Sequence, residues 1–155
     1  MLNDLYTKDV LRAAAMISRV GRLQNPQASA SRVSPVCGSK VTIDLNMANG
    51  IISDYAQDIH ACALGQAAAS VVASTIIGKA PEGPALAAKQ MRAMLTEGGE
   101  PPTGEWAALG LLQNVKDHKA RHGAVLLALE AALEAAGQIT GQVYDASSEQ
   151  LTRRA

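Results

Sequence analysis

The residues best suited to chemistry in this chain are its two cysteines, Cys37 and Cys62. A reduced thiol can lose its proton, and the resulting thiolate binds metals and accepts sulfur. Between the two cysteines lies Asn49-Gly50, a pair that favours the positive φ angles of a type I′ turn and therefore predicts a tight hairpin. Because Cys37 precedes the first strand of this hairpin and Cys62 follows the second, both thiols should lie at its open end. Cys62 alone would suggest a small buried residue, but its pairing with Cys37 across the hairpin favours a metal site.

The segments beside the turn have the pattern of half-buried strands. Apolar residues alternate with polar ones over 41–48, which is the period of two expected when one face of a strand is buried. Residues 51–61 should fold back as the antiparallel partner. A third strand is expected at 30–36, at an edge of the sheet, because Pro35 cannot donate a hydrogen bond to a neighbour.

The remaining apolar residues recur mostly at helical spacings. Cys62 should open a helix rich in Gly, Ala and Ser, which can pack closely on its neighbours, and Gly78 should end it as a left-handed cap. Helices are predicted at 2–20, 62–77, 85–95 and 123–136, with a short turn at 107–112. Together these segments predict one α+β domain over 1–136, a three-stranded antiparallel sheet with helices packed against it, followed by a polar tail over 137–155.

The motifs around the cysteines resemble those of the NifU-like iron-sulfur cluster scaffolds of the IscU and SufU type. The resemblance rests on Cys37-Gly38 before a strand, on the sequence from Asn49 to Asp54, and on Cys62 at the start of a helix of small residues. It extends to about Leu133. It implies the SufE/NifU fold, with the thiols as ligands.

The chain departs from the family pattern at two ligand positions. Where the family has a cysteine at the start of the last helix, this chain has Ala120-Arg121-His122-Gly123, so the missing thiol falls at Gly123 or Ala124. Ser39 stands where the family has an aspartate after Cys-Gly.

The ligand set that remains by resemblance is Cys37, Cys62 and His122, with His118 or His60 as outside candidates. Zinc and [2Fe-2S] clusters normally take four protein donors, so this set is incomplete. Two interpretations of His122 are equally good: it is a ligand, or it is a partly exposed histidine at a helix N-terminus. Residues 114–122 are expected to form the third wall of the site.

The resemblance implies a scaffold for iron-sulfur cluster assembly and not an enzyme. Such a protein binds iron or a [2Fe-2S] cluster and passes it to acceptor proteins, with a cysteine desulfurase as its partner; Arg121 or Lys119 would steer that partner. No acid–base pair or nucleophile triad is found in the sequence. Two alternatives stay open: a zinc-binding accessory that transfers sulfur for a desulfurase, and an adaptor of the same fold that binds no metal.

The overall charge excludes partners that depend on a strong field. The 155 residues include 14 Lys and Arg and 14 Asp and Glu, so neither nucleic acid nor an anionic membrane is expected to bind. Charges interrupt the apolar residues of the N-terminal stretch, which therefore does not suggest a signal peptide or a membrane span. The expected location is the cytoplasm, where both thiols would be reduced.

Overall fold

The Asn49-Gly50 turn forms as predicted and sets the geometry of the sheet. In the computed structural model, which describes residues 4–144, Asn49 has φ 54° and Gly50 has φ 77°. The turn joins β2 (Ser39–Ala48) to β3 (Ile51–His60), and β1 (Ala28–Ser34) pairs with β2 on its other side. All pairs are antiparallel, with one shift of register between Asn46 and Met47. This arrangement confirms the predicted α+β fold with its three-stranded sheet.

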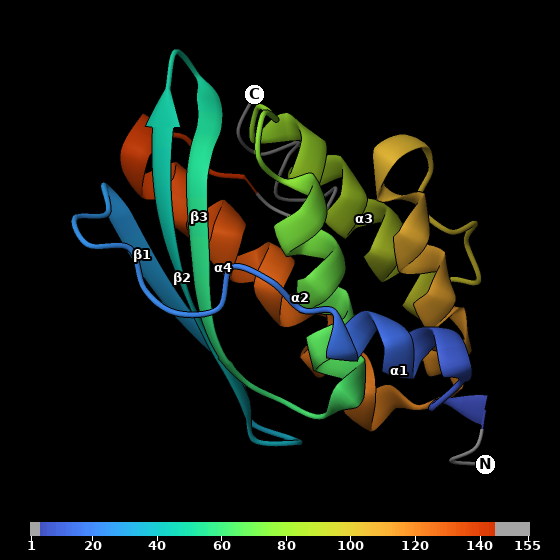
Figure 1. Ribbon diagram of the computed structural model, residues 1–155. Coiled ribbons are helices and arrows are strands. Elements are labelled where there is room, and N and C mark those ends of the chain that lie inside the picture. The colour runs from blue at the N-terminus through green and yellow to red at the C-terminus, as the bar shows by residue number, and fades with distance from the viewer. Residues whose placement is uncertain (1–3, 145–155) are drawn as a thin grey trace.

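The helices lie together on one side of the sheet (Figure 1). They are α1 (Lys8–Ala15), α2 (Ala63–Thr75), α3 (Glu82–Thr96) and α4 (His122–Thr140), together with two 3-10 helices, η2 (Gly104–Asp117) and η3 (Lys119–Arg121). α4 packs against β1 and β2, while α2 packs against α4 and α1. The core therefore lies between the sheet and the paired helices α2 and α4.

The long apolar segment Lys119–Thr140 would be long enough to cross a membrane, but 61% of its most apolar window is buried inside the domain. The side chains that α4 buries include Val125, Leu129 and Leu133. α4 is thus a core helix of the domain.

The other face of the sheet is crossed by residues 16–27, called here the crossing segment. Its backbone pairs with the free edge of β3, where Gly21 N–H donates to Gln57 O at 2.8 Å and Gln57 N–H donates to Arg19 O at 2.9 Å. The segment then passes over the sheet to reach β1 at the opposite edge (Figure 1). The segment therefore covers the outer face of the sheet where it crosses, while Val33, Lys40 and Asp58 stay exposed.

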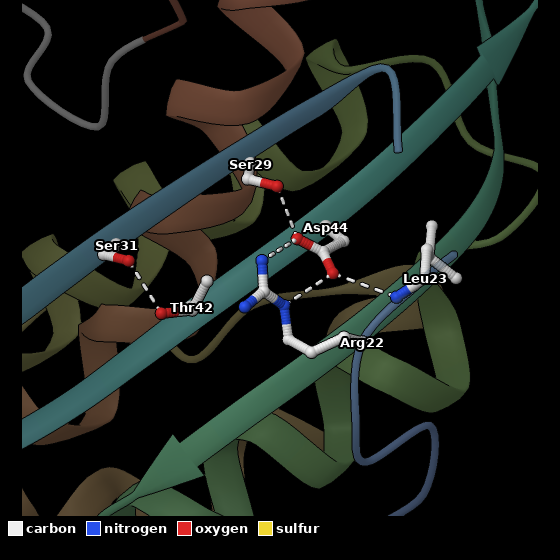
Figure 2. Close-up of polar contacts among 6 residues, drawn as sticks. All are labelled: Arg22, Leu23, Ser29, Ser31, Thr42 and Asp44. Atoms are coloured by element: carbon white, nitrogen blue, oxygen red, sulfur yellow. Dashed lines mark hydrogen bonds and ion pairs between the residues drawn. The ribbon is translucent and has the colours of Figure 1, made fainter. Parts of the chain in front are cut away.

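Asp44 holds the crossing segment to the sheet (Figure 2). Its carboxylate accepts hydrogen bonds from Arg22 Nε at 2.8 Å, Arg22 Nη2 at 3.0 Å, Leu23 N at 2.9 Å and Ser29 Oγ at 2.5 Å. The alternation in β2 predicted a polar outward position here, yet Asp44 is fully buried. Burial alone raises the pKa of Asp44, but the hydrogen bonds from Arg22, Ser29 and the Leu23 amide outweigh it, so the pKa lies below its ordinary value.

Several predicted boundaries were wrong. The helix predicted at 2–20 is limited to Lys8–Ala15, where the Thr7 side chain caps the first turn; residues 1–3 lie outside the described part. Gly78 has the expected positive φ of 86°, but α2 has already ended at Thr75. The Gly78 N–H donates instead to Ile52 O at 2.9 Å, which ties this segment to β3.

The C-terminal half also differs from prediction at two places. The turn predicted at 107–112 is part of the longer 3-10 helix η2, which continues to Asp117. α4 runs through Thr140, so the predicted tail over 137–155 begins inside a helix. The remainder of that tail, 145–155, lies outside the described residues.

Candidate functional site

Three segments meet at the open end of the hairpin. The pairing of Lys40 with His60 brings the turn before β2 and the chain after β3 to the same end of the sheet. The start of α2 contacts the start of α4, because a Cβ on Gly65 would lie 3.2 Å from Ala124 O. The start of α4 in turn contacts the end of β1, where Ser34 lies against Gly123. Both cysteines belong to this end of the molecule.

Cys37 lies in the turn that joins β1 to β2. Gly38, with φ 75°, makes the reversal possible, and its N–H donates to Ser34 O at 2.8 Å. This turn brings the Cys37 thiol within hydrogen-bonding distance of two hydroxyls, at 3.4 Å from Ser34 Oγ and 3.2 Å from Ser39 Oγ. Both serines are buried, whereas Cys37 is half-buried.

The surroundings of Cys37 favour its thiolate. Partial burial by itself raises the pKa of the Cys37 thiol. Hydrogen bonds with Ser34 and Ser39 and the positive charge of Arg121 have the larger combined effect, and the pKa of Cys37 lies below its ordinary value. A thiolate at a half-buried position can bind a metal or attack sulfur.

Cys62 is the N-cap residue of α2, with φ −67° and ψ 173°. Its side chain makes no capping hydrogen bond, and its carbonyl accepts from Gln66 N at 2.9 Å. The thiol is free and half-buried, at the helix end where unpaired N–H groups favour an anion. The role of Cys62 as a ligand stays a prediction.

His122 is the first residue of α4, and its ring is directed at the end of η2. The Nε2 atom lies 3.0 Å from Val115 O and 3.1 Å from Lys116 O. Since carbonyl oxygens only accept, Nε2 must carry the proton. In the neutral ring this leaves the lone pair on Nδ1, which is the tautomer of a histidine that binds metal through Nδ1 and donates from its other nitrogen.

The other two histidines lie on other elements. His60 is the last residue of β3, 77% exposed, with Nε2 3.4 Å from Asp58 Oδ1. His118 lies between η2 and η3. Within residues 4–144, no group of three or more His, Cys, Asp or Glu side chains is close enough to hold a metal ion. The structure thus brings Cys37 and Cys62 to one end but does not gather His122 with them.

Position 123, and not 124, faces the site. A Cβ on Gly123 would lie 2.5 Å from Ser34 Oγ, the same hydroxyl that contacts the Cys37 thiol. Ala124 is buried, and its carbonyl faces α2. Of the two positions left open for the absent cysteine, Gly123 is therefore the one from which a side chain would reach toward Cys37. Nothing in the sequence indicated the role of Ser34, because its contact with α4 joins residues far apart in the chain.

The fold and the site define a class of protein: a small α+β domain that carries two free thiols where a hairpin, α2 and α4 meet. The NifU-like N terminal domain model matches residues 5–125. The chain belongs to that family.

Solved structures agree with this assignment. A NifU-like protein (N-terminal) from Brucella abortus is 38% identical, with a TM-score of 0.88 over 92% of this chain and 99% of that one. A putative iron-sulfur cluster assembly scaffold protein for the SUF system from Fervidobacterium islandicum AW-1 shares the fold, at 22% identity and a TM-score of 0.78 over 85% of this chain and 96% of that one. The comparison with curated proteins found no match.

Proposed function

We propose that this protein is a scaffold for iron-sulfur cluster assembly, which binds iron or a [2Fe-2S] cluster as cargo and transfers it to acceptor proteins. It acts as a carrier and not as an enzyme, in the cytoplasm. Support comes from its family and from a relative described as a putative iron-sulfur cluster assembly scaffold. The proposed cargo ligands are Cys37, Cys62 and His122.

The observation that carries the proposal is the setting of the two thiols. Both are free and half-buried at the same end of the hairpin, so a bound ion would be held by protein and still be reachable from solvent. The Cys37 thiolate is favoured by Ser34, Ser39 and Arg121. Thiolates are the donors that iron-sulfur clusters use most.

The third ligand, His122, requires its ring to turn from the direction described above. Its ring now donates to the end of η2, while its neighbour Gly123 faces the contact between Ser34 and Cys37. Cargo binding would draw the Nδ1 lone pair toward the thiols. A site with two thiolates and one imidazole leaves a ligand position open, which suits a carrier that must release its cargo.

A cysteine desulfurase is the proposed sulfur donor, and its docking surface would surround Cys37. Val36, beside Cys37 in the same turn, is 74% exposed. Lys119 and Arg121 are on the neighbouring η3, and the charge of Arg121 reaches the Cys37 thiol. An apolar contact flanked by cations would direct an acidic partner to this thiol.

The test is the iron and acid-labile sulfide content of protein purified without oxygen. Wild type is expected to carry both, or to accept both on reconstitution, while Cys37→Ser and Cys62→Ser lose them. His122→Asn should bind less cargo than wild type, and His60→Asn, which changes an exposed histidine in the same way, should match wild type.

Two outcomes would replace the proposal. Zinc without sulfide, removed by the same cysteine substitutions, would indicate the zinc-binding accessory of a desulfurase. A folded protein that cannot be loaded with iron, sulfide or zinc would indicate the adaptor that binds no metal.

A further inference from the structure

Ser34 and Gly123 form a contact that leaves no room for a side chain at position 123. A Cβ there would lie 2.5 Å from Ser34 Oγ and 3.2 Å from Ser34 Cβ; the first distance is a clash, and the second is closer than ordinary contact. Gly123 lies within α4 and has no positive φ, so its backbone would accept any residue. The obstacle to a side chain is the serine itself.

Rotation of the Ser34 side chain cannot remove this obstacle without cost. Ser34 is 5% exposed, and its hydroxyl lies 3.4 Å from the Cys37 thiol. Turning the hydroxyl away from position 123 would disturb that contact, and Ser34 Cβ would still lie at 3.2 Å. Ser34 therefore links the packing of α4 to the setting of Cys37.

We propose that Ser34 determines how many thiolates this site can hold: it fills the place from which α4 would supply a third, and so limits the chain to Cys37 and Cys62. Both the Cys37 thiol and a Cβ at 123 lie within 3.4 Å of Ser34 Oγ, so removing the hydroxyl would open a space bordered by both. This inference rests on the proposed function insofar as it concerns metal ligands. The steric part does not depend on it.

The experiment compares Gly123→Cys, Ser34→Ala and the double variant S34A/G123C by titration with Co²⁺ without oxygen. Thiolates bound to Co²⁺ absorb in the near ultraviolet, and the intensity per bound ion grows with their number. The double variant should bind Co²⁺ through three thiolates, whereas wild type uses two. Its absorption intensity per bound ion should therefore be about 1.5-fold that of wild type. Gly123→Cys alone should stay at the wild-type intensity. Gly83→Cys is the matched control, because Gly83 is also the second residue of its helix and a Cβ there meets nothing closer than 3.7 Å.

Thermal unfolding of the same variants tests the steric part without metal. With Ser34 intact, Gly123→Cys should lower the Tm. In the Ser34→Ala background, the same substitution should lower the Tm less, or not at all. If Gly123→Cys does not fold, Gly123→Ala in both backgrounds gives the same comparison.

The proposal is overturned if Gly123→Cys reaches the higher Co²⁺ intensity with Ser34 intact, or if the folded double variant stays at the wild-type value. Equal losses of Tm in the two backgrounds would also overturn it. If wild type binds no Co²⁺ while the Tm comparison behaves as expected, the proposed function fails and the steric role of Ser34 stands.

Discussion

Replacing Asp44 by Asn tests whether the polar contacts on the outer face of the sheet hold β1 in position. The carboxylate joins β2 to the crossing segment through Arg22 and Leu23, and to β1 through Ser29 (Figure 2). Since β1 ends at Ser34, which contacts Cys37, this network supports the strand that carries part of the site.

The expected loss follows from the number of donors around the carboxylate. One oxygen accepts from Arg22 Nε and the Leu23 amide, and the other from Arg22 Nη2 and Ser29 Oγ. An amide keeps one acceptor oxygen, and its NH₂ group in the place of the other meets Arg22 Nη2 and Ser29 Oγ. The Ser29 hydroxyl can rotate to accept from the NH₂ group, whereas Arg22 can only donate, so one hydrogen bond is lost. The loss of one buried hydrogen bond to a charged group costs about 2 kcal/mol. We therefore expect Asp44→Asn to lower the free energy of unfolding by that amount at pH 7.

Urea unfolding followed by the fluorescence of Trp106, the single tryptophan, which is 6% exposed, measures this difference. Asp58→Asn is the control, because Asp58 is on the neighbouring strand and its side chain is 51% exposed. It should stay within about 0.5 kcal/mol of wild type. Equal effects of the two substitutions would refute the role given to Asp44.

The pH dependence gives a second check with a definite sign. The pKa of Asp44 is lowered in the folded state, so its stabilising effect is complete above the unfolded pKa of about 3.9 and is lost as the pH falls through the folded pKa. The difference between wild type and Asp44→Asn should be constant from pH 7 to about 4 and shrink below that. A difference that grows as the pH falls would contradict the argument.

Three further predictions concern the interior. Gln57→Leu should destabilise the protein by about 2 kcal/mol, because it leaves the buried Tyr55 hydroxyl, which donates to Gln57 Oε1 at 3.0 Å, without its acceptor; chemical denaturation measures it, and a neutral effect would mean that water replaces the amide. Gly123→Ala should destabilise by about 1 kcal/mol, a clash cost that exceeds the gain in helix propensity, whereas Gly83→Ala should be neutral or stabilising; the same sign at both glycines would contradict this. Leu64→Ala, at a fully buried position in α2, should cost about 3 kcal/mol, and a loss under 1 kcal/mol would show that the core collapses around the cavity.

The sequence was sufficient for the parts of the fold that local rules decide. Asn49-Gly50 specified the turn, and the alternation around it specified β2 and β3, because both depend on residues close together in the chain. The same local order placed Cys37 and Cys62 at one end of the molecule.

The parts that the sequence missed depend on contacts between distant segments. Asp44 reads as an outward polar residue until the crossing segment covers it, and Ser34 reads as an ordinary strand residue until α4 packs on it. Only 107–112 of η2 was predicted, because a 3-10 helix has no 3.6-residue period to detect and Gly104, with φ 66°, resembles a loop residue. His122 was found from its place in the family pattern, but the direction of its ring is set by the carbonyls of η2.

Cys37 and Cys62 are placed by local structure, whereas a third thiol on α4 would have to be placed by contacts between distant segments. Cys37 and Cys62 are brought to one end by a single local hairpin, whereas a donor on α4 must be placed by packing across the domain. At Gly123 that packing is made by the Ser34 side chain, which lies against the Gly123 backbone. By our proposal, Ser34 thus fills the place of a ligand side chain. α2 and α4 pack on each other in the apolar core, where Leu64 and Leu129 are both fully buried. We therefore expect the proposed cargo to be gained or lost without loss of the fold, unlike the ion of a structural zinc domain, which unfolds without it.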